Sequence, residues 1–195
     1  MAKLHFYYGV MGSSKSAQLI INAFNYRTSG KNVEVIKPAI DTRFDTNKVV
    51  SRAGNLSTDA LVLKNLDNYQ PKPETHVVFV DEVQFFSPSD IDKLAHFADI
   101  QDKIVICYGL MVDSNEKLFP ASQHLVEVGA ELHQMESNCQ IHGCLHRATH
   151  HLRFDTNGNV IHAGEQVVLG DTNYKSVCRM HFNEMYKNIS QKTRK

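Results

Sequence analysis

The stretch Phe6–Ile20, FYYGVMGSSKSAQLI, decides the fold because it passes from a strand pattern through a glycine-containing turn into a helix pattern. The apolar run from Leu4 to Tyr8 predicts a first strand. Apolar residues beyond the turn recur at helical spacing, and Gly30 is well placed to end the helix. This helical series consists of Leu19, Ile20, Ala23 and Phe24.

The turn between these two elements fits most of the phosphate-binding pattern G-x-x-x-x-G-K-[ST]. Gly9, Lys15 and Ser16 occupy their expected places, whereas Ser14 stands where the pattern has its second glycine. In such a loop, consecutive backbone N–H groups converge on an anion at the start of a helix. The lysine reaches the β- and γ-phosphates, and the serine hydroxyl ligates Mg²⁺. The alternative is a polar loop that contains glycine and lysine by chance.

Short apolar runs alternate with helical patterns from Leu4 to about Val128. Three of these runs, rich in β-branched residues, predict buried strands at Val33–Ile36, Val77–Val80 and Ile104–Tyr108. The segment between the last two runs carries a Ser/Asp cap and a helical apolar series. Strands that alternate with helices predict an α/β fold with a parallel sheet covered on both faces.

Two acids, Asp81 and Glu82, follow the run Val77–Val80. Phosphate-loop enzymes keep the acid that holds Mg²⁺ at such a strand end, so Ser16 and Asp81 are the predicted magnesium residues. Glu82 points elsewhere and is free to accept a proton from a substrate hydroxyl. A solvated loop is the alternative for this pair. Of the aromatic residues that follow, Phe85 and Phe86, we expect one to pack in the core.

The composition changes near residue 136, where the chain becomes rich in Cys, His and turn residues. Asn157-Gly158 predicts a hairpin turn there. We therefore expect a nucleotide-binding domain over residues 1–135, a small β-rich domain over 136–186 and a charged tail over 187–195.

This second region carries closely spaced metal-ligand residues. Cys178 and His181 have zinc-ligand spacing, as do Cys139 and His142, and Cys144 offers a third sulfur. The predicted zinc ligands are Cys139, Cys144, Cys178 and His181, with His142 as the substitute for Cys144. Buried thiols beside surface histidines are the alternative. The remaining candidates are expected to be surface or packing residues: Cys107, His133, His146, His150, His151 and His162.

Charge and the length of the apolar runs argue against nucleic acid and membranes as partners of the protein. The 195 residues have a formal net charge of zero, and residues 136–186 contain four Lys/Arg against five Asp/Glu, which argues against nucleic-acid binding. The apolar runs are far shorter than the roughly 20 residues of a membrane span. Because the amino terminus has no apolar stretch of signal-peptide length, we expect a cytoplasmic protein with no membrane partner.

Taken in order along the chain, these elements resemble the thymidine kinases of the small, zinc-containing type. The resemblance spans nearly the whole sequence. Besides the opening stretch, it is carried by IKPAIDTRF (Ile36–Phe44), VFVDEVQFF (Val78–Phe86), CYGLMVDSNEKLF (Cys107–Phe119) and GEQVVLGDTNYKSVCRMH (Gly164–His181). It implies a RecA-like phosphate-loop domain, a zinc-binding lasso domain and a cytosolic homotetramer.

The resemblance also implies roles for individual residues. The reaction would be transfer of the γ-phosphoryl group of ATP to the 5′-hydroxyl of thymidine, with deoxyuridine also accepted, using Mg²⁺ and a structural Zn²⁺. Glu82 would be the catalytic base, and Asp41 and Arg43 would lie near the phosphates. The implied ATP-binding residues are Gly9, Val10, Met11, Gly12, Ser13, Ser14, Lys15, Ser16, Asp81, Glu82, Val83 and Gln84. The implied nucleoside-binding residues are Phe85, Leu110, Phe119, Val168 and Tyr174.

The sequence departs from the family pattern at functional elements. Ser14 replaces the loop glycine, and Ser114 and Asn115 stand where relatives carry an aromatic residue and then a polar or basic one. Loss of that ring favours a deoxynucleoside kinase of broader specificity as one alternative. A catalytically weak nucleotide-binding homologue is another, because of Ser14 and Ser114 together.

Overall fold

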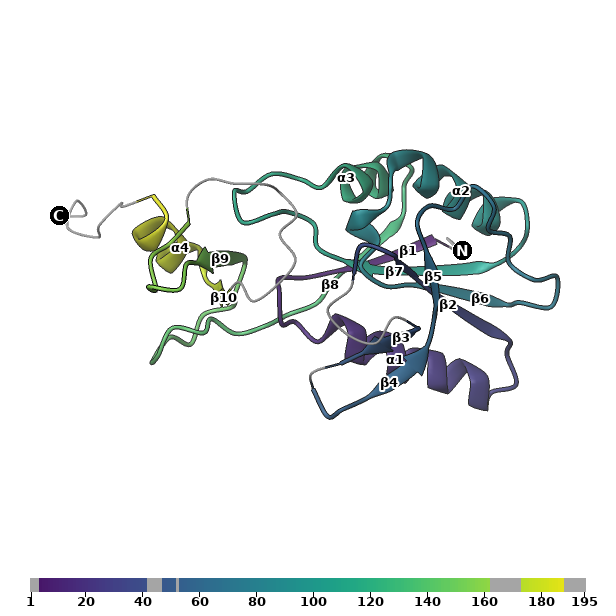
Figure 1. The fold of residues 1–195 in the computed structure, drawn as a ribbon, viewed down its shortest axis with the longest axis horizontal. Coiled ribbons are helices and arrows are strands. Elements are labelled where there is room, and N and C mark those ends of the chain that lie inside the picture. Colours follow the sequence, from purple (N-terminus) through teal and green to yellow (C-terminus); the bar gives the residue numbers. More distant parts are fainter. Residues whose placement is uncertain (1–3, 42–46, 52, 162–172, 188–195) are drawn as a thin grey trace.

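The fold is built on a six-stranded parallel sheet (Figure 1). The computed structural model describes residues 4–41, 47–51, 53–161 and 173–187. The strand order is β5-β2-β6-β7-β1-β8, and every pair of neighbours in the sheet is parallel. The predicted α/β class with a parallel sheet is therefore confirmed. The strands are β1 (Leu4–Tyr8), β2 (Val33–Pro38), β5 (Leu61–Leu63), β6 (Val77–Val80), β7 (Ile104–Gly109) and β8 (Glu131–Gln134).

Helices cover both faces of this sheet. On one side lie α2 (Pro88–Asp99) and α3 (Pro120–Glu127), and on the other lie α1 (Lys15–Thr28) and the antiparallel pair β3 (Lys48–Val50) and β4 (Ser57–Asp59) (Figure 1). Each face of the sheet has its own hydrophobic core, and alternate residues of β1 pack into one or the other. Leu4 and Phe6 pack on the α2 side, and Tyr7 packs on the α1 side. Gly30, with a φ of 78°, follows the end of α1 as predicted.

A smaller unit follows the sheet. The antiparallel strands β9 (His150–Phe154) and β10 (Asn173–Val177) pack with α4 (Arg179–Met185) around a separate core that includes Leu152, Val177 and Phe182. The predicted turn at Asn157-Gly158 is present, with Gly158 at a φ of 82° and Phe154 bridged to Val160. This unit lies at one end of the molecule (Figure 1). The domain boundary at residue 135 and the tail from residue 187 stay predictions.

None of the helices in the described part of the chain has the length and apolarity needed to cross a bilayer.

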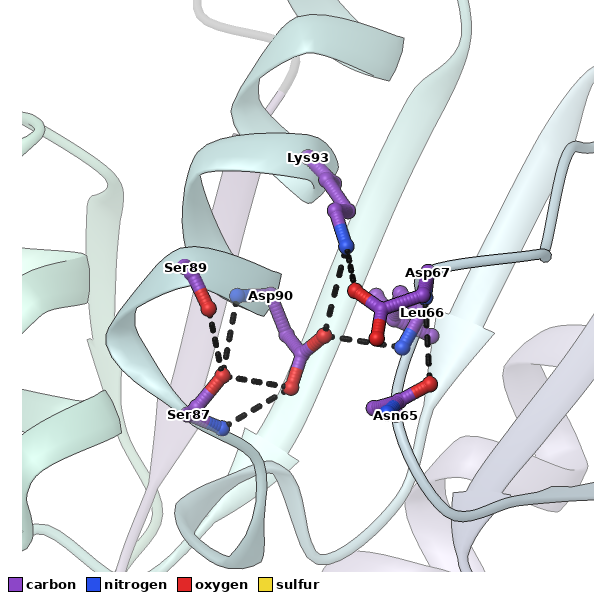
Figure 2. Close-up of polar contacts among 7 residues, drawn as sticks. All are labelled: Asn65, Leu66, Asp67, Ser87, Ser89, Asp90 and Lys93. Carbon is purple, nitrogen blue, oxygen red and sulfur yellow. Dashed lines mark hydrogen bonds and ion pairs between the residues drawn. The ribbon is translucent and has the colours of Figure 1, made fainter.

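A buried carboxylate anchors the start of α2. Ser87 and Asp90 form a capping box, in which the Ser87 Oγ accepts from the Asp90 backbone N–H and the Asp90 side chain accepts from the Ser87 N–H (Figure 2). The Asp90 Oδ1 also accepts from the Leu66 N–H at 2.8 Å, which ties the loop before β6 to the helix. Burial raises the pKa of Asp90, but the hydrogen bonds from Leu66 and Ser87 outweigh it and hold the pKa below its usual value.

Replacing Asp90 with Ala should therefore destabilise the fold. We expect Asp90→Ala to lower the free energy of unfolding by about 2–3 kcal/mol at neutral pH, because buried N–H groups lose their acceptor. The deficit should shrink as pH falls below about 4, since a carboxylate with a lowered folded-state pKa stabilises only where it is ionised. Urea denaturation at several pH values measures both effects.

Asp92 on the same helix provides the matched control. Its side chain is exposed and pairs with His124 at 2.7 Å. Exposed ion pairs contribute about 0–1 kcal/mol, so Asp92→Ala should cost much less than Asp90→Ala. Equal losses for the two variants would contradict the role given to Asp90.

Candidate functional site

The candidate site lies at the carboxyl ends of β1, β6 and β7. Residues 9–14 follow β1, Asp81 and Glu82 follow β6, and Leu110 follows β7. Because these neighbouring strands are parallel, all three segments leave the sheet at the same edge. Open α/β sheets bind ligands at this edge.

The loop after β1 has a backbone that restricts its side chains. A Cβ atom at Gly9 would lie 2.4 Å from the Ser13 Oγ and 2.8 Å from the Met135 carbonyl oxygen, so no larger residue fits there. Gly12 and Ser14 both have positive φ, at 74° and 60°. Ser14 is the residue before α1 and makes no side-chain capping hydrogen bond. The pattern's second glycine position therefore requires the left-handed conformation, and serine adopts it here with strain.

Lys15 is folded back into this loop. Its ammonium donates to the Val10 carbonyl at 2.8 Å, to the Gly9 carbonyl at 3.3 Å and to the Ser13 Oγ at 3.4 Å. The residue is only 8% exposed. A buried ammonium at the start of a helix is well suited to pair with an anion there.

Ser16 connects the loop to the end of β6. Its hydroxyl donates to the Asp81 Oδ2 at 3.0 Å, and Asp81 is buried. Burial raises the pKa of Asp81, and the charges of Glu82 and Asp41 act in the same direction. Three carboxyl groups therefore share a small region at the ends of β2 and β6. Such a concentration of negative charge, with a hydroxyl beside it, favours a divalent cation with oxygen ligands.

Glu82 is held in an unusual backbone conformation. Its φ of 48° lies in the left-handed region, where it precedes the short 3₁₀ helix η1 (Val83–Phe85). The Gln84 side chain donates to the Glu82 carboxylate, and its Oε1 accepts from the Leu110 N–H at 3.0 Å. A Cβ at Gly109 would lie 2.5 Å from that Oε1, so only a glycine at this position leaves room for the Gln84 side-chain amide. Gln84 thus fixes the Glu82 side chain against the end of β7.

Part of the predicted nucleoside-binding set is brought together beside Glu82. The Phe85 ring meets the Phe119 ring edge to face, with 6.2 Å between the ring centroids. Leu110 follows β7, and its N–H contacts Gln84, the residue before Phe85. Phe85 is partly exposed, whereas Phe86 is buried in the main core, so Phe86 is the aromatic residue that packs inside. Tyr174 lies in β10, opposite Arg153. Arg43, Val168 and His162 lie outside the described residues.

The segment from Met111 to Phe119, which carries the departures from the family pattern, is tied down by Asp113. The Asp113 Oδ1 accepts from the N–H groups of Asn115 at 2.8 Å and Lys117 at 2.9 Å. The Asn115 Oδ1 accepts in turn from the Tyr186 hydroxyl at 2.8 Å, beside α4. Asn115 therefore fastens this segment to the smaller unit, a contact that spacing in the sequence does not predict.

The smaller unit gathers a cluster of metal-ligand side chains. Cys139, Cys144, Cys178 and His181 each offer one donor atom, and these atoms all lie within 4.8 Å of one another. They are the four residues predicted as first choice from the sequence. His142 is exposed and is not part of the cluster. His146 Nδ1 lies 3.5 Å from the Cys144 Sγ but is also outside the four.

The donor separations fit one tetrahedral zinc ion. Zn–S bonds of about 2.3 Å and Zn–N bonds of about 2.0 Å place tetrahedral donors about 3.5–3.8 Å apart. The Sγ atoms of Cys144 and Cys178 are 3.9 Å apart, and His181 Nδ1 lies 3.4 Å from Cys139 Sγ and 3.3 Å from Cys178 Sγ. Three thiols and one imidazole with no open position form the donor set of a structural site.

Two residues near the loop were not assigned to it from the sequence. Ser176 on β10 donates its hydroxyl to the Met11 carbonyl, which joins the smaller unit to the loop. His151 on β9 is buried, as expected of a packing histidine. Burial, together with the positive charges of Lys15 and His150, lowers the pKa of His151 to about 4, so the ring is neutral beside the loop. Neither contact has a sequence signal, because both depend on how β9 and β10 dock.

Comparison with known proteins defines the class to which this fold and site belong. The family model described as thymidine kinase matches residues 2–182. A thymidine kinase of Photorhabdus laumondii is 37% identical, covering all of this chain and 98% of that protein. One of Rhodopirellula baltica is 38% identical over 94% and 89% of the two chains, and one of Enterobacteria phage T4 is 35% identical over 97% and 100%.

The chain belongs to the thymidine kinase family, as the sequence resemblance predicted. Membership makes it a kinase.

The strain at Ser14 can be tested by restoring glycine. We expect Ser14→Gly to raise the free energy of unfolding by about 1 kcal/mol, because glycine adopts positive φ without the clash of a Cβ. For a chain of this size, that gain corresponds to about 2–4 °C in Tm. Ser14→Ala is the matched control, since it keeps the Cβ and loses no capping bond, and it should give no gain. Equal melting temperatures for the two variants would contradict the strain.

The four-residue cluster predicts which substitutions remove zinc. We expect one zinc ion per chain to survive dialysis against a weak chelator, and Cys144→Ser to lose it because one of four donors is weakened. His142→Asn should retain the ion, since that side chain lies outside the cluster. Elemental analysis of the purified proteins measures both. Loss of zinc from the His142 variant with retention in the Cys144 variant would reverse the ligand assignment.

Proposed function

We propose that this protein transfers the γ-phosphoryl group of ATP to the 5′-hydroxyl of thymidine, giving dTMP for nucleotide salvage. Membership of the thymidine kinase family supports the reaction class. The observation that carries the proposal is the convergence of Lys15, Ser16, Asp81 and Glu82 at one edge of the sheet. A basic loop, a hydroxyl–carboxylate pair and a separate carboxylate are the groups that phosphoryl transfer to an alcohol needs.

Residues 9–16, with the turn from Asp81 to Gln84, are proposed to bind ATP. The backbone N–H groups at the start of α1 and the Lys15 ammonium would receive the phosphates, with Lys15 exchanging its contacts to loop oxygens for phosphate oxygens. Mg²⁺ held through Ser16 and Asp81 would neutralise charge on the transferred group. Asp41 lies close enough to raise the pKa of Asp81 and belongs to the same charged region.

Glu82 is proposed to act on the acceptor hydroxyl. Its carboxylate takes the proton of the 5′-hydroxyl while the new O–P bond forms, and the bond from the γ-phosphorus to the bridging oxygen breaks as ADP leaves. Gln84 is a positioning residue in this scheme, because its hydrogen bonds to Glu82 and to the Leu110 N–H fix the direction of the carboxylate.

Phe85, Leu110 and Phe119 are proposed to form one wall of the nucleoside site, with Tyr174 contributing from the smaller unit. Val168, which lies outside the described residues, stays a predicted contact. Edge-to-face packing against Phe119 leaves Phe85 partly exposed, as a residue that contacts a planar base must be. Relative rates with thymidine, deoxyuridine and deoxycytidine would separate a thymidine kinase from a broader deoxynucleoside kinase. Zinc in the Cys3His cluster, a homotetrameric assembly and a cytoplasmic location complete the proposal.

Replacing Glu82 with Gln tests the assignment of the base. We expect Glu82→Gln to lower kcat by about 10²–10⁴-fold, since an amide cannot accept the proton of the hydroxyl. ATP affinity should change little, because Lys15 and the Ser16–Asp81 pair remain. Steady-state rates with thymidine, ATP and Mg²⁺ measure turnover, and fluorescence titration with a labelled ATP analogue measures binding.

Glu127→Gln is the control for this experiment. Glu127 is exposed on α3 and pairs with His124, away from the sheet edge that carries the site. Its substitution should leave kcat unchanged. Near-normal turnover of Glu82→Gln would overturn the role of Glu82, and absence of phosphoryl transfer by the unmodified protein with ATP binding retained would support a catalytically weak homologue instead.

A further inference from the structure

Two histidines and a glutamate form a cluster at the β8 edge of the main sheet. His5 on β1 and both Glu131 and His133 on β8 offer ligand atoms that lie within 4.8 Å of one another. Glu131 and His133 are two positions apart on one strand, so their side chains point to the same face. The parallel register pairs His5 with Glu131, which places all three on that face.

The separations of these atoms match those around one metal ion. His5 Nδ1 lies 3.2 Å from His133 Nε2 and 3.3 Å from Glu131 Oε2, and His133 Nε2 lies 3.6 Å from Glu131 Oε1. Metal–nitrogen and metal–oxygen bonds of about 2.0–2.2 Å place tetrahedral donors about 3.3–3.6 Å apart. Each ring nitrogen lies near a different oxygen of the Glu131 carboxylate, and the two ring nitrogens lie next to each other, so the three donors surround one point.

The surroundings hold the three groups in place and leave them accessible. The His133 ring stacks on the Tyr7 ring at 4.3 Å, and Tyr7 in turn stacks on Tyr108 in the core. The side chains of His5 and His133 are 20% and 29% exposed, and that of Glu131 is 47% exposed. Two paired strands fix the backbone, so binding an ion would cost little ordering of the protein.

We infer that His5, Glu131 and His133 form a binding site for a divalent first-row transition-metal ion such as Zn²⁺. Two imidazoles and one carboxylate are ligands of borderline softness, which suit Zn²⁺, Ni²⁺ and Cu²⁺ rather than Mg²⁺ or Ca²⁺. Three protein ligands leave a coordination position for water or another exogenous ligand. The site is separate from the Cys3His cluster. It is also separate from the candidate active site, which lies at the carboxyl ends of the strands, and it does not depend on the proposed reaction.

Zinc stoichiometry tests this site. The zinc-loaded protein is dialysed against buffer with micromolar free Zn²⁺ and excess Mg²⁺, and the zinc bound per chain is measured by elemental analysis. We expect the unmodified protein to bind one more equivalent than His5→Asn/His133→Asn. Glu131→Gln should weaken binding of this equivalent by at least about tenfold, since even groups outside the coordination shell contribute that much. Electron paramagnetic resonance of the Cu²⁺-loaded protein should show coupling to two imidazole nitrogens.

His96→Asn, an exposed substitution on α2, is the matched control and should keep the additional equivalent. Circular dichroism checks that every variant is folded, and the tightly held zinc of the Cys3His cluster should be the same in all. Equal zinc content and affinity in the unmodified protein and the double variant would overturn the site. If the double variant does not fold, Glu131→Gln decides, and an unchanged zinc affinity in that variant overturns the site equally.

Discussion

Parallel pairing of β1, β7 and β6 is the constraint on which the candidate site depends. A parallel sheet sends the segments after its strands to one edge, so residues 9–16 and Asp81 meet although 65 positions separate Ser16 from Asp81. The hydrogen bond between the Ser16 hydroxyl and the Asp81 carboxylate forms because β1 and β6, on either side of β7, end at the same edge of the sheet. The buried runs of β6 and β7 supply the apolar core that keeps this pairing rigid.

Several residues of the candidate site have conformations or surroundings that destabilise the folded protein. Ser14 and Glu82 both have left-handed backbones, and Asp81 is a carboxyl group buried beside other acids. Each of these features costs free energy that the surrounding core has to offset. Strained backbones and a raised carboxyl pKa occur together at these strand ends, and such features cluster at functional sites.

The smaller unit is linked to this edge by several contacts that act together. Ser176 reaches the Met11 carbonyl in the loop, and Tyr186 reaches Asn115 in the segment that precedes α3. Both donors belong to chain segments that the Cys3His cluster holds in place, because that cluster joins Cys139 and Cys144 to Cys178 and His181. The position of the loop is therefore linked to the Cys3His cluster through these contacts.

The sequence by itself determined the elements whose signals are local. The apolar periods predicted the strands β1, β2, β6 and β7 and the helices α1 and α2. The loop pattern placed Lys15 and Ser16 after β1, and the close spacing of Cys and His marked the cluster. Only the tertiary structure decided that Cys144 rather than His142 joins the cluster, that Gln84 connects Glu82 to Leu110, and that His5 meets His133. Those outcomes depend on strand register, side-chain direction and backbone φ, which are set by packing between segments distant in the chain and leave no periodic trace in it.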